Sequence, residues 1–322
     1  MGTVCGINLY QYGTEKLYQE IFERIREIDQ TMSAREGIFY HQLSSVIEIN
    51  KNAGIAPVKT GNDLLDVLEK AKYIAELSNG AFDPTIGPLV NLWGIGTDNE
   101  RIPNPDEITQ ALSLINWQDL IIDREQGTAF LRRPGMELDL GGIVKGYAAD
   151  EAAQIIKEAE VDHAVIDLSG NILAVGNSIN KDWRGNNIPW RIGIQAPLKE
   201  RGEFIGILSI ADKTVVTSGV YERFFEFDGI RYHHILSTEN GYPVDKGLLS
   251  VSIVTNSSID ADGFSTAVFA LGFEQGLALL ETIPDTGAIF IFDDQSVYIT
   301  DNLKEIFTLT NDEYTVHNLS AQ

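Results

Sequence analysis

A lysine close to two glycines is the first group in this sequence with a clear chemical use. The run from Asp139 to Lys145 ends an expected strand on a carboxylate, passes through Gly141 and Gly142, and enters a helix at about residue 142. Free amides at a helix start favour anions, and a lysine adds a point charge suited to phosphate. The segment therefore predicts a phosphate site. The alternative is a plain Gly-rich turn with a solvated lysine, because the spacing matches neither the dinucleotide nor the P-loop fingerprint.

A carboxylate and a hydroxyl one helical turn apart form the second candidate. Asp262 and Thr266 are four residues apart in an expected helix, so they share one face. Such a pair can give two oxygen ligands to Mg²⁺, which completes its shell with carbonyls, water and substrate phosphate. The alternative is helix capping by Asp260 or Asp262, with Thr266 bonded to a backbone carbonyl.

Two further segments carry groups that could serve a reaction. His233 and His234 end a strand beside a polar turn, and one of them could act as a general base near neutral pH. Adjacent strand residues face opposite sides, so at most one reaches a given site. The alternative is a surface histidine, or one bonded to the turn backbone. Residues 81–83, with Trp93, could hold a planar heterocycle by stacking and hydrogen bonding, or could simply anchor a long loop to the core.

The elements that must position these groups follow from apolar spacing and from turn residues. Helices are predicted at 15–30, at 60–78 with a cap at Thr60 or Asn62, from 105 to about 115, from about 142, at 257–270 and at 273–283. Strands are predicted at 119–123, 128–133, 136–140, 163–167, 171–176, 190–195, 203–210, 223–234, 249–255 and 287–299. Residues 80–96 contain four Gly and two Pro and are predicted as a structured loop. The pattern is that of an α+β protein with largely antiparallel sheets.

Length and charge limit what the protein can be. A chain of 322 residues suggests one large domain or two packed lobes, approximately 1–160 and 161–322. The net charge of −23 excludes a nucleic-acid partner, since binding to nucleic acid depends on basic side chains. The single cysteine, Cys5, excludes a disulfide framework. The first residues have no basic and apolar leader pattern, so the chain is expected to be cytoplasmic or to have lost a leader.

Taken together, the motifs resemble a known family. The ordered series is Met1-Gly2-Thr3, GAFDPTIGPLVNLWG, ELDLGGIVKGYAAD, DLSGNILAVG, PWRIGIQAP, TSGVYERFFEFDGIRYHHI, NGYP and ADGFSTAVFALG, which spans residue 1 to about 272. This series is similar to that of the ApbE family, the FAD:protein FMN transferases. The resemblance implies an α+β fold with mixed, mostly antiparallel sheets packed with helices in two lobes, forming a single domain over 1–322.

The resemblance also implies an activity and its residues. Members are Mg²⁺-dependent enzymes that split FAD, attach FMN through a phosphoester to a Thr or Ser hydroxyl of an acceptor protein, and release AMP. Matched position by position, His234 is the expected base and Asp262 the second catalytic residue. The implied FAD contacts are Met1, Arg35, Ala81, Phe82, Asp83, Asp139, Lys145 and Leu236. The implied metal ligands are the Gly142 carbonyl, Asp262 and Thr266, with Ser265 adjacent.

Partners and location follow from the same resemblance. The expected partners are FAD and an acceptor protein with a Thr or Ser flavinylation motif, of the type found in membrane redox subunits. The resemblance favours an extracytoplasmic protein that is membrane-anchored in its full-length form, with the cytoplasm as the alternative. Two other functions are consistent with the same residues: a FAD pyrophosphatase that gives FMN and AMP, and a non-catalytic flavin-binding protein.

Overall fold

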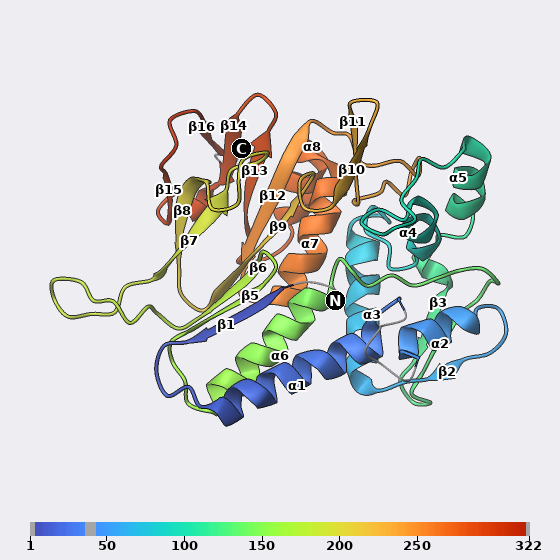
Figure 1. The fold of residues 1–322 in the computed structure, drawn as a ribbon, viewed down its shortest axis with the longest axis horizontal. Coiled ribbons are helices and arrows are strands. Elements are labelled where there is room, and N and C mark those ends of the chain that lie inside the picture. Colours follow the sequence, from blue (N-terminus) through green and yellow to red (C-terminus); the bar gives the residue numbers. More distant parts are fainter. Residues whose placement is uncertain (1–3, 36–42, 320–322) are drawn as a thin grey trace. The chain divides into compact units, whose positions relative to one another are not determined.

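The chain divides into two compact units, each built from separate stretches of sequence. The computed structural model describes residues 4–35 and 43–319 (Figure 1). Unit 1 contains Arg26–Val144 and Glu222–Lys246, and unit 2 contains Gly2–Ile25, Lys145–Tyr221 and Gly247–Gln322. The expected lobe boundary near residue 160 therefore does not coincide with a unit boundary. The expectation of a single domain over 1–322 stays a prediction.

An eight-stranded sheet organises unit 2. Its strands are, in spatial order, β1 (Cys5–Leu9), β5 (Ala164–Leu168), β6 (Asn171–Val175), β9 (Lys213–Gly219), β12 (Leu248–Thr255), β13 (Gly287–Phe292), β14 (Ser296–Thr300) and β16 (Thr315–Leu319). Neighbouring strands are antiparallel except for the parallel pair β14 and β16. β12 is buried along nearly its whole length, which is typical of a strand in the middle of a covered sheet.

Helices α6 (Val144–Glu158), α7 (Ser258–Leu271) and α8 (Phe273–Leu280) belong to the same unit. α7 packs on β9 and β12, and most of its residues are buried, so it is apolar around most of its circumference. α6 meets α7 backbone to backbone at Gly146. A Cβ added at Gly146 would lie 2.1 Å from the Ser258 carbonyl oxygen, so only glycine fits this crossing.

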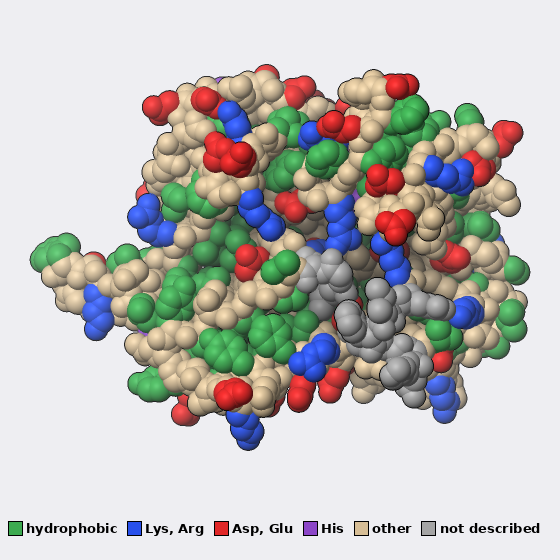
Figure 2. Space-filling view, in the orientation of Figure 1, with side chains coloured by type: hydrophobic (Ala, Val, Ile, Leu, Met, Phe, Trp, Pro, Cys, Tyr) green, Lys and Arg blue, Asp and Glu red, His purple; other side chains and the backbone are tan. Residues whose placement is uncertain are grey.

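A second, three-stranded sheet completes unit 2. Its strands are β7 (Trp190–Gln195), β8 (Phe204–Ile210) and β15 (Phe307–Leu309), in the order β15-β8-β7, and a short helix, η2 (Asp301–Leu303), precedes β15. Apolar side chains of this sheet and of the larger one form a common core. The connection between β6 and β7 projects from the rest of unit 2 (Figures 1 and 2).

Unit 1 is mainly helical around Trp93, which is fully buried. Its elements are α2 (Ser45–Lys51), β2 (Val58–Lys59), α3 (Asn62–Leu77), α4 (Gly87–Trp93), α5 (Pro105–Leu112), η1 (Trp117–Asp119), β3 (Leu120–Asp123), β4 (Thr128–Leu131) and the hairpin β10 (Phe224–Phe227) and β11 (Ile230–His233). Helix α1 (Glu15–Met32) has residues in both units. No helix in the described part of the chain is long and apolar enough to cross a membrane.

Several predicted elements need correction. Residues 80–96 are not only a loop, because α4 lies within them; Pro88 is in its first turn, where proline is tolerated, and Gly94 ends it in a left-handed conformation. Residues 136–140 form no strand. The Leu138 amide bonds to the Asn50 side chain and the Asp139 amide to the Pro84 carbonyl, so loops rather than a partner strand satisfy this backbone.

One helix cap and several elements also differ from expectation. α3 has Gly61 as its N-cap rather than Thr60 or Asn62. The short helix α2 and the strands β2, β9, β15 and β16 were not predicted. By contrast, the predicted helices at 15–30, 142 onward and 257–270 match α1, α6 and α7 to within a few residues. The α+β class with mostly antiparallel sheets is confirmed.

Candidate functional site

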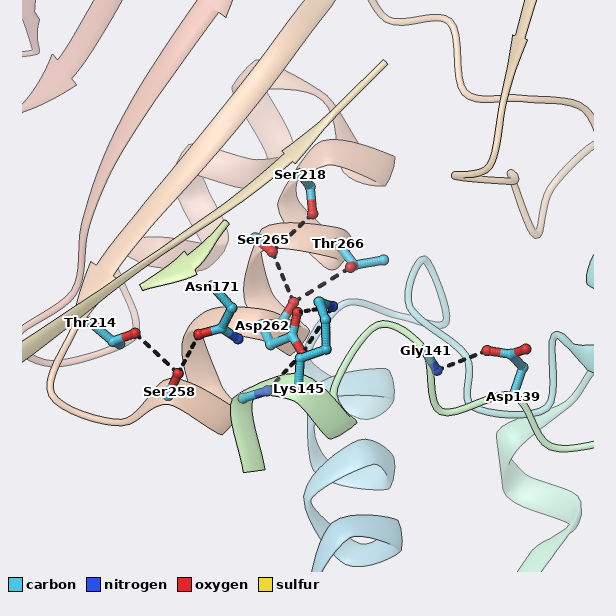
Figure 3. A network of polar contacts seen from close by, with 11 residues as sticks. Asp139, Gly141, Lys145, Asn171, Thr214, Ser218, Ser258, Asp262, Ser265 and Thr266 are labelled. Carbon is cyan, nitrogen blue, oxygen red and sulfur yellow. Dashed lines mark hydrogen bonds and ion pairs between the residues drawn. The ribbon is translucent and has the colours of Figure 1, made fainter. Parts of the chain in front are cut away.

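Asp262 is the centre of a buried polar site in unit 2 (Figure 3). Its side chain is almost fully buried in α7, and its carboxylate faces the first turn of α6. Lys145 Nζ donates to Asp262 Oδ1 at 3.0 Å, and the Gly146 backbone N–H donates to Oδ2 at 2.9 Å. A cation and an amide therefore compensate this carboxylate, which would otherwise be costly to bury.

Thr266 and Ser265 lie one turn further along α7. The Thr266 hydroxyl donates to the Asp262 carbonyl oxygen at 3.4 Å and is partly exposed. Ser265 is fully buried; its hydroxyl donates to the same carbonyl at 2.9 Å and lies 2.9 Å from the Ser218 hydroxyl of β9. Thr266 thus lies on the open side of the helix, whereas Ser265 bonds the helix backbone and β9. Their assignment as metal ligand and adjacent residue stays a prediction.

The cap of α7 rules out one alternative for Asp262. The N-cap is Ser257, whose side chain accepts a hydrogen bond from the Asp260 amide, so neither aspartate caps the helix. Asp150 of α6 completes this helix start by accepting the Ser258 and Ile259 amides at 2.8 and 2.9 Å. Burial raises the pKa of Asp150 to about 6. Sequence reasoning did not single out Asp150, because its partners are more than a hundred residues away.

Asn171 was also missed by sequence reasoning. It begins β6, is 1% exposed, and accepts a hydrogen bond from the Ser258 hydroxyl at 2.7 Å. Its amide nitrogen makes no hydrogen bond, and Figure 3 shows this nitrogen on the side of the group that faces Asp262. Such an orphaned donor beside a carboxylate could only have been found from the structure.

In unit 1, residues 80–85 form the loop that the sequence predicted to contact the flavin, and we call it the flavin loop. Hydrogen bonds to the Asp83 side chain hold this loop in place. Asp83 is 5% exposed; one carboxylate oxygen accepts from the Thr85 amide and hydroxyl, and the other from the Trp117 amide. Burial raises the pKa of Asp83. Phe82 is also buried, so of the predicted triplet only Ala81 is partly exposed. Trp93 is a core anchor rather than a stacking platform, because it is fully buried and donates to the Gly241 carbonyl.

Asp139 lies in unit 1, in the turn that precedes α6. Its carboxylate accepts from the Gly141 amide at 2.8 Å, and its own amide donates to Pro84, which joins this turn to the flavin loop. Gly142 follows, and its carbonyl stays a predicted ligand. Arg35 is exposed, with its amide bonded to the Ser33 hydroxyl. Met1 lies outside the described residues. The roles of Asp139 and Arg35 in binding FAD likewise stay predictions.

The two histidines have different surroundings, as expected for adjacent strand residues. His233 is buried; it accepts from the Ile235 amide through Nδ1 and donates to the Val244 carbonyl through Nε2. Burial lowers the pKa of His233, which favours the neutral ring. His233 is therefore structural.

His234 is partly exposed, and its Nδ1 lies 3.2 Å from the Arg223 carbonyl oxygen. Because a carbonyl oxygen only accepts, Nδ1 carries the proton and Nε2 is the basic nitrogen. This is the tautomer that a general base at Nε2 requires. Leu236, two residues further, is a buried core residue. The turn that follows is tied to the flavin loop, because the Thr238 hydroxyl donates to the Gly80 carbonyl at 2.8 Å.

The donor set at Asp262 suits a hard cation. The described residues contain no group of three or more His, Cys, Asp or Glu side chains that could hold a metal. A cation at Asp262 would therefore depend on one carboxylate, with hydroxyl, carbonyl and substrate oxygens completing its shell, which are ligands that Mg²⁺ accepts. Thr266 fits this set, because a hydroxyl that donates to a carbonyl still has lone pairs to offer.

The chain is similar to known proteins along most of its length. The family model of the ApbE family matches residues 1–290. A protein of Treponema pallidum called FAD:protein FMN transferase is 36% identical over 308 residues, covering 92% of this chain and 84% of that protein. A Klebsiella pneumoniae protein of the same name is 34% identical over 321 residues, covering 100% and 96%.

Solved structures show the same fold. The crystal structure of the ApbE protein from Thermotoga maritima has a TM-score of 0.82 and 29% identity, covering 95% of this chain and 96% of that one. The flavin transferase ApbE from Vibrio cholerae has a TM-score of 0.80 and 27% identity, with the same coverage. The sequence match and the fold together show that this chain belongs to the ApbE family.

Proposed function

We propose that this chain is an enzyme that transfers FMN from FAD to a Thr or Ser hydroxyl of an acceptor protein and releases AMP. The observation that carries the proposal is the Asp262 carboxylate held by Lys145 and the Gly146 amide, in a chain whose relatives are called FAD:protein FMN transferases. In the reaction, the acceptor oxygen forms a bond to the FMN-side phosphorus. The bond from that phosphorus to the AMP oxygen breaks, and the acceptor proton passes to a base.

Charge is the main obstacle to this reaction, because the pyrophosphate is doubly anionic and the leaving oxygen gains negative charge. Lys145 supplies a positive charge at the start of α6, where backbone amides add to it. Asp262 and Thr266 would hold Mg²⁺, and a cation there would supply positive charge against the charge of the pyrophosphate. Because Lys145 shares the Asp262 carboxylate, metal binding there would leave its ammonium group available to a phosphate oxygen.

The proton needs an acceptor, since the pKa of a Thr or Ser hydroxyl lies far above neutral pH and the group stays protonated without a base. We assign this role to His234, because its Nδ1 proton is committed to the Arg223 carbonyl and Nε2 is left as the basic nitrogen. We assign Asp139 and the loop at 81–83 to orienting the flavin nucleotide. The buried contacts of Asp83 support a role in shaping that loop.

The acceptor and the location are part of the same proposal. We infer an acceptor of the membrane redox subunit type and an extracytoplasmic, membrane-anchored full-length protein, both from the family resemblance. The net charge of −23 supports a partner other than nucleic acid.

The test is incubation with FAD, Mg²⁺ and a library of short peptides that each carry one Thr or Ser. We expect peptides that gain the mass of FMN less one water, as a phosphoester requires, in amounts equal to the AMP released. Free FMN and AMP without modified peptide would instead show a FAD pyrophosphatase, in which water replaces the hydroxyl. Intact FAD after long incubation would show a flavin-binding protein without turnover.

A further inference from the structure

The connection between β6 and β7 presents a tryptophan to solvent. We call residues 178–188 the arm; it projects from unit 2, in yellow-green in Figure 1. Trp183 at its tip is 86% exposed, and Ile179 is 40% exposed. Trp93 and Trp190, by comparison, are buried. Tryptophan is enriched at interfaces and at membrane surfaces, so a tryptophan this exposed, on a segment outside the core, points to a contact outside the chain.

The arm is an ordered hairpin. The Ser178 amide bonds to the Ile188 carbonyl at 2.9 Å, and the Asp182 amide to the Asn186 carbonyl at 2.8 Å. The Asp182 carboxylate then closes the tip by accepting the amides of Arg184 and Asn186 at 2.8 and 2.9 Å. These hydrogen bonds lower the pKa of Asp182 and keep it ionised. The tip therefore presents Trp183 to solvent from a hydrogen-bonded turn.

The base of the arm is tied to a second group of exposed aromatic residues. His163 Nδ1 lies 2.6 Å from the Asn177 carbonyl, and its Nε2 lies 3.3 Å from the Asn187 amide nitrogen. The His163 carbonyl in turn accepts the Tyr10 amide at 2.9 Å. Tyr10 is 45% exposed, and its ring centre lies 4.7 Å from that of Trp190, the first residue of β7.

Tyr12 follows in the turn between β1 and α1 and is 78% exposed. Figure 2 shows hydrophobic side chains at the tip of the arm and again over this turn. We call the three exposed aromatic residues Trp183, Tyr10 and Tyr12, together with the aliphatic Ile179, the aromatic belt. All four belong to unit 2, so the belt is a feature of one compact unit.

The charge of the arm differs from that of the chain. The chain carries a net charge of −23, but the arm has Lys181 and Arg184 against Asp182 alone. The Arg184 guanidinium lies 4.4 Å from the centre of the Trp183 ring, so the cation stays beside the aromatic group. A contact surface for this tip must therefore accept an aromatic ring and two positive charges together.

We propose that the aromatic belt lies on the surface of a lipid bilayer with anionic headgroups. Trp and Tyr are the residues that favour the boundary between headgroups and acyl chains, and flanking Lys and Arg are attracted to anionic lipid. A protein partner is disfavoured because a stable protein interface buries roughly 1,200–2,000 Å², which separated aromatic tips do not offer. The acidic remainder of the chain would be repelled by such a surface, which confines the contact to the belt.

The test uses the 322-residue chain with phosphatidylcholine vesicles that contain about a third phosphatidylglycerol. We expect the chain to sediment with these vesicles, a blue shift of tryptophan emission on addition of lipid, and quenching of that emission by brominated lipid. Trp183→Ser should weaken vesicle binding about tenfold, because the main apolar group at the tip is gone. Lys181→Gln with Arg184→Gln should reduce binding to anionic vesicles to the level seen with pure phosphatidylcholine.

Ile55→Ser is the matched control. Ile55 is 74% exposed but lies in unit 1, so this variant should bind vesicles as the unaltered chain does. If the chain sedimented neither with the anionic vesicles nor with those of pure phosphatidylcholine, the proposal would be overturned. Equal vesicle binding by the Trp183→Ser and Ile55→Ser variants would also overturn it. The thermal unfolding temperature of Trp183→Ser should not change, since the side chain is exposed. The assay needs neither FAD nor an acceptor, so its result is independent of the proposed transferase function.

Discussion

Gly146→Ala should separate the two helices that form the Asp262 site. A Cβ at this position would lie 2.1 Å from the Ser258 carbonyl oxygen and 2.6 Å from the Ile259 Cα, both backbone atoms that cannot rotate away. Ordinary contact begins at 3.4 Å, so the difference, 3.4 minus 2.1, requires a shift of 1.3 Å. A shift of that size breaks the 2.9 Å bond from the Gly146 amide to Asp262, because such bonds extend to only about 3.2 Å.

The expected change in the free energy of unfolding has three contributions. Overpacking of this kind costs about 3 kcal/mol, and Ala regains about 1 kcal/mol over Gly in a helix. Loss of a hydrogen bond to the buried Asp262 carboxylate adds about 1 kcal/mol. The free energy of unfolding should therefore fall by about 3 kcal/mol, and the melting temperature by roughly 5 °C or more. AMP release from FAD should fall with it, because Lys145 and Asp262 no longer face each other.

Circular dichroism during heating and in urea measures the change in stability, and chromatography of AMP measures turnover. Gly6→Ala is the control in the same unit, because a Cβ there meets only the Asp167 carbonyl, at 3.9 Å. Its stability should stay within about 0.5 kcal/mol of the unaltered chain. If Gly146→Ala melted at the temperature of Gly6→Ala and kept full turnover, the crossing of α6 and α7 described here would be wrong.

Three further predictions concern the same group of residues. Asp262→Ala should abolish Mg²⁺-dependent AMP release while FAD binding survives in weaker form; full turnover of this variant in the presence of EDTA would contradict the metal assignment. Lys145→Ala should raise the dissociation constant for FAD measured by calorimetry, and an unchanged constant would remove Lys145 from the site. Asp150 has a folded-state pKa of about 6, raised from 3.8, so its contribution to stability is fully present below the unfolded pKa and is lost as the pH rises through about 6. Asp150→Asn should therefore flatten the change in urea midpoint between about pH 4 and 7, whereas parallel curves for the two proteins would show that burial does not raise this pKa.

Local sequence signals were sufficient to predict features that lie within a single helix or strand. The i and i+4 spacing of Asp262 and Thr266 placed both on α7, and Pro105 correctly marked the start of α5. The alternation of strand faces correctly predicted that the two adjacent histidines have different surroundings, and the structure showed that His233 is the buried one. Composition was less informative. The Gly and Pro content of residues 80–96 predicted a loop, but the structure has the helix α4 within this range.

The sequence by itself determined the α+β class, the main helices, the family, and which residue types could hold a phosphate and a hard cation. These depend on spacing within one helix or strand and on ordered motifs, which the chain carries locally. Only the tertiary structure decided that Lys145 and the Gly146 amide face Asp262, that Asp150 completes the start of α7, and that Asn171 has an orphaned amide. These contacts join residues 87 to 117 positions apart, and no local pattern encodes the close approach of two helices that brings them together.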